Sequence, residues 1–174
     1  MERSRRFARE WRSIGLAKRM KWRQEKGDGM VSLITAKIVE AFGENGLDVL
    51  SAAYEEKGEE DGSKIAESLN IERADLHSAV SVIEALCIIF GIDSNFKEEG
   101  GRMTLKLDAC PFEYILTLYR ESLCIYYVQG LVHAINPCVK VKIVKKICEG
   151  GDHCLFQFTL SSDENASDRV WSYA

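Results

Sequence analysis

Apolar residues recur at helical spacing through the first half of the chain. Leu33, Ile34, Ile38 and Phe42 follow that spacing, which predicts an amphipathic helix over residues 30–42. The same periodicity predicts three further helices, at residues 47–58, 63–71 and 74–86.

Glycines divide this helical region. Gly43 and Gly46 precede the second predicted helix, and Gly58 and Gly62 precede the third. Glycine within a helical pattern often marks a break, and Ser63 is a suitable N-cap for a new helix. We therefore expect short helices here, not one long helix.

The pattern changes to strands after residue 86. Residues 87–96 are rich in β-branched and aromatic side chains. After a Gly-Gly turn, Met103, Leu105 and Leu107 alternate with polar residues. Together these segments predict a β-hairpin with one solvated face.

A second hairpin is expected at residues 139–160, around the Gly150-Gly151 turn. Each of its strands carries one apolar row, and these rows are Val139, Val141, Ile143, Ile147 and Cys154, Phe156, Phe158, Leu160. This register turns Cys154 inward and Cys148 outward.

A long helix is predicted between the hairpins, over residues 111–136. Pro111 suits its first turn, and Pro137 follows its end. Its second half is apolar almost all round, so we expect it to be buried centrally or at a dimer interface.

The order of elements predicts an α+β fold: a four-stranded antiparallel sheet of two hairpins, backed by helices, with an N-terminal helical region. We expect a basic helical arm at residues 1–29, one α+β domain at 30–162 and a polar tail at 163–174.

Charge separates the arm from the domain. Residues 1–29 carry a net charge of +6, whereas residues 30–174 carry -10. The arm is expected to lie across the acidic body of its own or a partner subunit, with nucleic-acid binding or a frayed tail as alternatives. Glutamates 55, 56, 59 and 60 with Asp61 form an acidic run, typical of a solvated or docking face; a site for a hard metal ion is the alternative.

The chain has no transmembrane run and no apolar signal core, which favours a soluble, cytoplasmic protein. In that compartment its six cysteines are expected to be reduced thiols.

Cys110 is the first candidate for chemistry. Placed before Pro111, it is the expected N-cap of the long helix, where backbone N–H groups and the helix dipole lower a thiol pKa. The alternative is a small buried residue. Cys124 and Cys154 are expected to approach it, either as a metal site for zinc or iron or as core packing.

A polar stripe on the long helix is the second candidate. Ser122, Tyr126, Gln129 and His133 are spaced by three or four residues on an otherwise apolar helix. Such a stripe predicts either a pocket wall, with Tyr126, Gln129 and Cys124 binding a ligand, or a hydrogen-bonded internal network.

Histidine bases complete the candidate site. His133, or His153 oriented by Asp152, would serve a nucleophilic Cys110 or Cys154. The alternatives are an internal histidine and an ordinary turn.

The second half of the chain resembles the L-2-amino-thiazoline-4-carboxylic acid hydrolase-like proteins and, more distantly, the 4-vinyl reductase type of small-molecule-binding domain. Cys110-Pro111-Phe112, Cys124, the run Gly-Gly-Asp-His-Cys and Phe-Gln-Phe carry the resemblance, together with the glycine-containing helices. It covers roughly residues 30–160.

The resemblance implies a ligand-binding α+β domain, often dimeric, with a pocket near Cys110, Cys124 and Cys154. If the activity carries over, the reaction is ring-opening hydrolysis of a cyclic C=N compound at its C–S bond. The alternatives are a non-catalytic sensor or carrier for an apolar compound, metal or porphyrin, and an interaction module. The expected partners are a small molecule and a second copy held by the arm, not a membrane or nucleic acid.

Overall fold

The chain folds as an α+β domain. The computed structural model describes residues 31, 33–72, 74–90, 92–110 and 123–161. Residues 33–42 are helical, and the labelled elements that follow are α3 (Glu44–Leu69), α4 (Leu76–Phe90), β1 (Ser94–Glu99), β2 (Arg102–Leu107), α6 (Cys124–His133), β3 (Val139–Lys145), η1 (Ile147–Glu149) and β4 (Cys154–Leu160). The predicted fold class is confirmed.

The four strands form one antiparallel sheet in the order β1-β2-β4-β3. Each predicted hairpin is present, as β1–β2 and β3–β4. Strands β2 and β4 join the hairpins and pair Leu105 with Phe156. The second strand of each hairpin, β2 or β4, therefore lies at the centre of the sheet.

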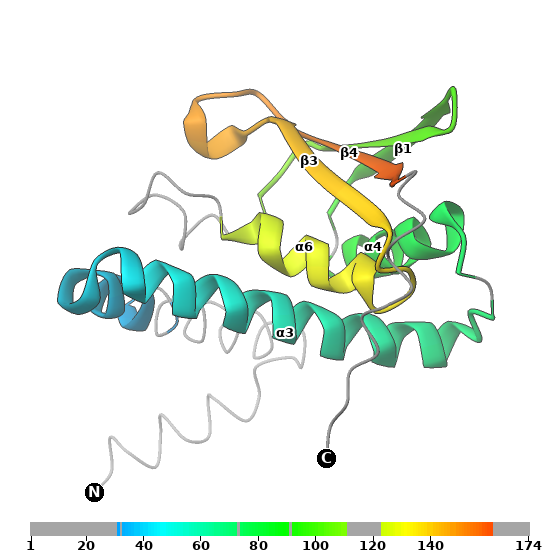
Figure 1. Cartoon of the computed structure of the whole chain (residues 1–174). Coiled ribbons are helices and arrows are strands. Elements are labelled where there is room, and N and C mark those ends of the chain that lie inside the picture. Colours follow the sequence, from blue (N-terminus) through cyan, green and yellow to red (C-terminus); the bar gives the residue numbers. More distant parts are fainter. Residues whose placement is uncertain (1–30, 32, 73, 91, 111–122, 162–174) are drawn as a thin grey trace, which may run out of the picture.

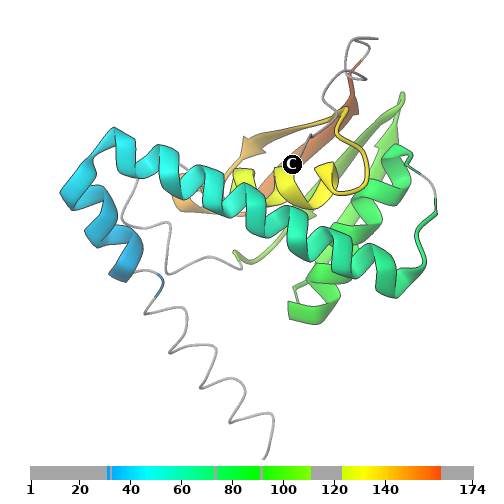
Figure 2. The ribbon, with the colours of Figure 1, turned by 60° about the horizontal axis from the view of Figure 1, so that its bottom comes forward.

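Helix α6 lies between the sheet and α3, and α4 covers the sheet beside it (Figures 1 and 2). Both faces of α6 are thus covered, which explains why its sequence is apolar almost all round. Leu131 and Val132 of α6 are fully buried, as is Phe158 of β4. The predicted central burial of this helix is confirmed.

The helix-facing side of the sheet follows the predicted alternation. Met103, Leu105 and Leu107 are buried, and Phe156 and Phe158 stack beside them. The third strand departs from the prediction because a bulge follows Ile143, so the row ends there. Ile147 belongs to the 3₁₀ turn η1 instead.

The short helices predicted between residues 44 and 71 are wrong. Helix α3 runs unbroken over 26 residues. Gly58 and Gly62 lie buried within it, and Ser63 is an interior residue, not an N-cap. The helix ends at Asn70, whose φ of 51° is left-handed.

The first hairpin begins later than predicted. Helix α4 continues through Cys87 to Phe90, and β1 starts only at Ser94. The β-branched Ile88 and Ile89 thus lie on the last turn of the helix, where they are 73% and 69% exposed. Strand propensity here gave way to the apolar face of α4, which packs Val80, Ile83 and other side chains into the core.

Three predicted segments lie outside the described residues. They are the basic arm at 1–29, the first part of the 111–136 helix and the tail at 163–174. The N-cap role of Cys110 and the position of Ser122 depend on the second segment.

Candidate functional site

Three glycines bring the backbones of α3 and α6 into direct contact. A Cβ atom on Gly130 would lie 2.0 Å from the Glu55 carbonyl oxygen, and one on Gly58 would lie 2.2 Å from the Tyr127 carbonyl oxygen. On Gly62 it would lie 2.6 Å from the Leu131 carbonyl oxygen. No other residue fits between the helices, so the contact fixes which side chains of α3 face α6.

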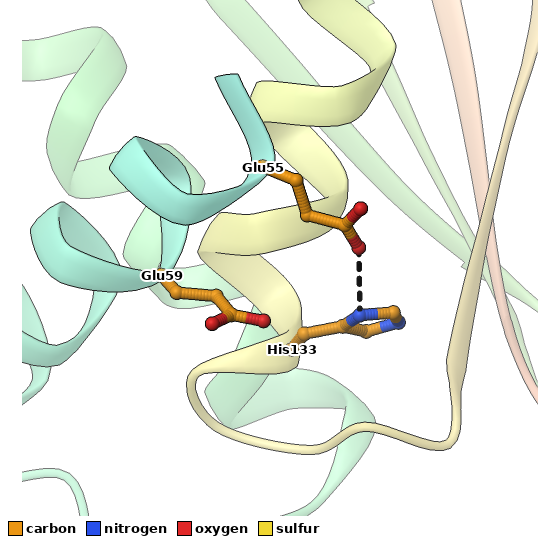
Figure 3. A group of neighbouring side chains, drawn as sticks. All are labelled: Glu55, Glu59 and His133. Carbon is orange, nitrogen blue, oxygen red and sulfur yellow. Dashed lines mark ion pairs between the residues drawn. The ribbon is translucent and has the colours of Figure 1, made fainter. Parts of the chain in front are cut away.

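The first cluster lies where α3 faces the last turn of α6. It consists of Glu55 and Glu59 of α3 and His133 of α6, and we call it the carboxylate–histidine cluster (Figure 3). One ligand atom from each residue lies within 4.8 Å of the others. His133 Nδ1 is 3.5 Å from Glu55 Oε1. Within the described part of the chain, this is the one group of three or more His, Cys, Asp or Glu side chains that meets this distance.

The other side of the imidazole faces β3. His133 Nε2 lies 3.1 Å from the Val139 carbonyl oxygen, and Gln129 Nε2 donates to the same oxygen at 3.1 Å. The two side chains also contact each other. Gln129 and His133 therefore form the hydrogen-bonded network that was one of the two alternatives for the polar stripe.

The second cluster surrounds Cys124, the first residue of α6. We call it the cysteine cluster, and its members are Cys110, Cys124, Cys148 and Cys154. Cys124 is buried, and the other three thiols lie within its electrostatic range. Burial, with a smaller effect of these neighbouring thiols, raises the pKa of Cys124 to about 12. Cys124 therefore lies near enough to Cys110 and Cys154 to interact electrostatically, and a direct contact between these thiols stays a prediction.

Cys154 and Cys148 differ as the strand register predicted. Cys154 is buried, its Sγ accepts a hydrogen bond from the Ile147 backbone N–H at 3.4 Å, and burial raises its pKa. Cys148 is exposed on η1. The three cysteines predicted to hold zinc or iron do not meet the distance that defines the carboxylate–histidine cluster. Their metal role stays a prediction.

The hydroxyl groups of Tyr54 and Thr35 lie next to the cysteine cluster. Tyr54 of α3 lies within electrostatic range of Cys124, and its hydroxyl interacts with the Thr35 side chain. Thr35 is 2% exposed, and burial raises the pKa of Tyr54. Sequence reasoning missed both residues; the polar Thr35 among the apolar positions of the 33–42 helix was the available signal.

The Asp152-His153 turn lies directly before β4. Asp152 Oδ1 contacts His153 Nδ1 at 2.7 Å, so the predicted contact is present. The same oxygen lies 2.5 Å from Lys145 Nζ, and that interaction is the main reason why the pKa of Asp152 falls to about 2. The Asp152 side chain is 77% exposed. Tyr126, predicted to bind substrate, is half-buried on α6.

A membrane-spanning helix would need a length and an apolar character that none of the described helices combines.

Comparison with solved structures gives the same fold at low sequence identity. The phenol-responsive sensory domain of the transcription activator PoxR, solved with phenol, matches with a TM-score of 0.57 and 12% identity, over 76% of this chain and 74% of that chain. Subunit 3 of a trafficking protein particle complex from Naegleria fowleri, covalently bound to palmitic acid, matches with a TM-score of 0.52 and 13% identity, over 79% of this chain and 96% of that chain. No curated protein matches the chain.

A family model covers most of the domain. The model of methanogen output domain 1 matches residues 26–159. It is neither of the two groups that the sequence resembles, and neither resemblance is confirmed. The chain belongs to the methanogen output domain 1 family.

Proposed function

We propose that this domain is a sensory module that binds a small apolar molecule at the cysteine cluster. The observation that carries the proposal is that Cys124 interacts electrostatically with both Cys154 and Tyr54, and that Tyr54 in turn interacts with the buried Thr35. Ligand sites are mostly apolar with a few polar groups that orient the ligand. Protonated thiols supply a soft apolar lining, and the two hydroxyls supply the polar groups.

The two structural neighbours support an apolar ligand. One is described with phenol and the other with palmitic acid, and both compounds are mainly apolar with one polar end. A hydroxyl or carboxyl head beside Tyr54, with an apolar body against Cys124 and Cys154, matches the composition of the cluster.

The protonation of the thiols favours binding over hydrolysis. A nucleophilic cysteine acts as the thiolate, and a raised pKa keeps the thiol protonated at neutral pH. The pKa values of Cys124 and Cys154 are both raised. The hydrolytic reaction implied by the resemblance gains no support from these two residues.

The test is ligand binding to the full chain, measured by calorimetry and by the shift in Tm with phenol and with palmitate. We expect at least one compound to bind. Tyr54→Phe, which removes one hydroxyl, should weaken binding about tenfold, as the loss of one hydrogen bond implies.

The matched control is Cys87→Ser. Cys87 is also a buried cysteine, but it lies on α4 beside Ser94 and Glu84. The Cys87→Ser variant should bind the ligand with the affinity of the wild type. Binding of neither compound, or equal weakening by Tyr54→Phe and Cys87→Ser, would overturn the proposal.

A further inference from the structure

We propose that the carboxylate–histidine cluster is a binding site for a first-row divalent metal ion. Glu55 and Glu59 supply carboxylate oxygens and His133 supplies Nδ1, all within 4.8 Å of one another. In Figure 3 the three side chains extend from α3 and α6 toward a common point.

The electrostatics of α3 single out these two carboxylates. Residues four apart share one face of a helix, where two like charges repel. The lysines of this stretch form ion pairs with other carboxylates: Lys57 pairs with Glu60 and Asp61, and Lys64 pairs with Glu60. Asp61 also accepts a hydrogen bond from the Tyr127 hydroxyl at 2.9 Å. Glu55 and Glu59 instead face His133, and a divalent cation at this point offsets their repulsion.

The hydrogen bond to β3 prepares His133 for this role. Metal binding at Nδ1 requires the tautomer with the proton on Nε2, and in that tautomer Nε2 donates to the Val139 carbonyl oxygen 3.1 Å away. Nδ1 is the atom that faces Glu55. A backbone carbonyl behind the second ring nitrogen is the usual support of a metal-bound histidine.

The backbone holds the three residues in place. Gly130 contacts the backbone of α3 at both Glu55 and Glu59, and it lies one turn before His133. The ligands therefore come from two helices that cannot slide past each other without a clash. His133 is 24% exposed and Glu55 is 38% exposed, so an ion can reach the cluster from solvent.

The donor set defines the class of ion. Two carboxylates and one imidazole suit Mn²⁺, Fe²⁺ and Zn²⁺, and three protein ligands leave coordination positions for water or another ligand. Thiols are absent from this set of three. The inference is independent of the proposed function, because the cysteine cluster lies at the other end of α6.

Mn²⁺ is the suitable probe, because it binds oxygen and nitrogen ligands and leaves the thiols unoccupied. Chelator-treated full-length protein is titrated with MnCl₂, and free Mn²⁺ is followed by electron paramagnetic resonance. We expect one bound Mn²⁺ per chain. Glu59→Gln, a change at an exposed side chain, should weaken binding at least tenfold.

Glu56→Gln is the matched control. It removes one negative charge from the same helix, one residue from Glu55 and outside the cluster, so its affinity should stay within twofold of the wild type. A direct histidine ligand should also appear as ¹⁴N coupling in pulsed spectra of the Mn²⁺ complex. That coupling should vanish in His133→Asn.

Three results would overturn the site. They are absence of Mn²⁺ binding, equal loss in Glu56→Gln and Glu59→Gln, and a bound Mn²⁺ without ¹⁴N coupling. The first would show that Glu55, Glu59 and His133 lie close together without forming a metal site. None of them affects the ligand test at Tyr54, so the two proposals fail separately.

Discussion

Because the Cys124 thiol is buried, the free energy of unfolding should fall as the pH rises into the alkaline range. Its pKa is raised from 9.0 to about 12 in the folded chain, whereas the unfolded chain ionises it near the lower value. A group with a raised folded pKa contributes its full stability below the unfolded pKa and loses it as the pH rises toward the folded pKa.

We therefore predict that the free energy of unfolding falls between pH 9 and pH 12. The loss from this one group is at most about 1.4 kcal/mol per pH unit. Urea unfolding at a series of pH values measures it. Cys124→Ala should flatten the slope, and Cys148→Ala, which changes an exposed thiol, should leave it unchanged. Parallel slopes in all three proteins would contradict the prediction.

At this scale, sequence reasoning succeeded where one strand or one helix decides the outcome. Strand parity placed Cys154 inside and Cys148 outside, and helical spacing found Gln129 and His133 together. It did not find Glu55 and Glu59 beside His133, because their meeting depends on how two distant helices pack. The acidic run was visible, but its histidine lies more than seventy positions further along the chain.

At the scale of elements, glycines in a helical sequence pattern have two opposite structural roles. Gly43 does interrupt the helical region, with φ at 57°. Gly58 and Gly62 lie inside an unbroken helix and serve its contact with α6. A single sequence shows only the local cost of glycine in a helix; the packing gain that offsets it belongs to the partner helix.

The contact predicts a large effect for Gly130→Ala. Alanine favours a helix over glycine by about 1 kcal/mol, but the new Cβ would meet a backbone carbonyl that no rotamer change can move. Separation of the helices should cost about 3 kcal/mol, so the net loss of stability is about 2 kcal/mol. Chemical denaturation measures it.

Gly101→Ala is a useful comparison. Its Cβ meets nothing within 4 Å, and its cost comes only from a φ of 73°. We expect a loss of about 1–2 kcal/mol there, without any change in the packing of α6. If Gly130→Ala were neutral or stabilising, the close contact of α3 and α6 would be wrong.

At the scale of the whole molecule, the sheet order decides which parts open last. Strands β2 and β4 pair on both sides, whereas β1 and β3 are edges. β1 is mostly exposed, and β4 alternates buried and half-buried residues. The hairpins were readable from alternation, but the β2–β4 pairing was not, because no turn connects those strands.

We predict that amide hydrogen exchange is slowest in β4 and β2 and fastest in β1. Central strands open only with the whole domain, whereas an edge strand with few buried side chains opens locally. Exchange followed by mass spectrometry at peptide resolution tests this order. Equal protection of β1 and β4 would show that the sheet unfolds as one unit.

The glycine contact between α3 and α6 also has a mechanical consequence. Two helices separated by side chains can adjust to each other through rotamer changes, but two touching backbones have no such slack. α6 carries a residue of the cysteine cluster at its first position and one of the carboxylate–histidine cluster at its last. It acts as a stiff rod about 15 Å long. A ligand that shifted α6 at the cysteine cluster would therefore also shift His133, and a coupling of binding free energy between the two proposed sites would be equal in both directions.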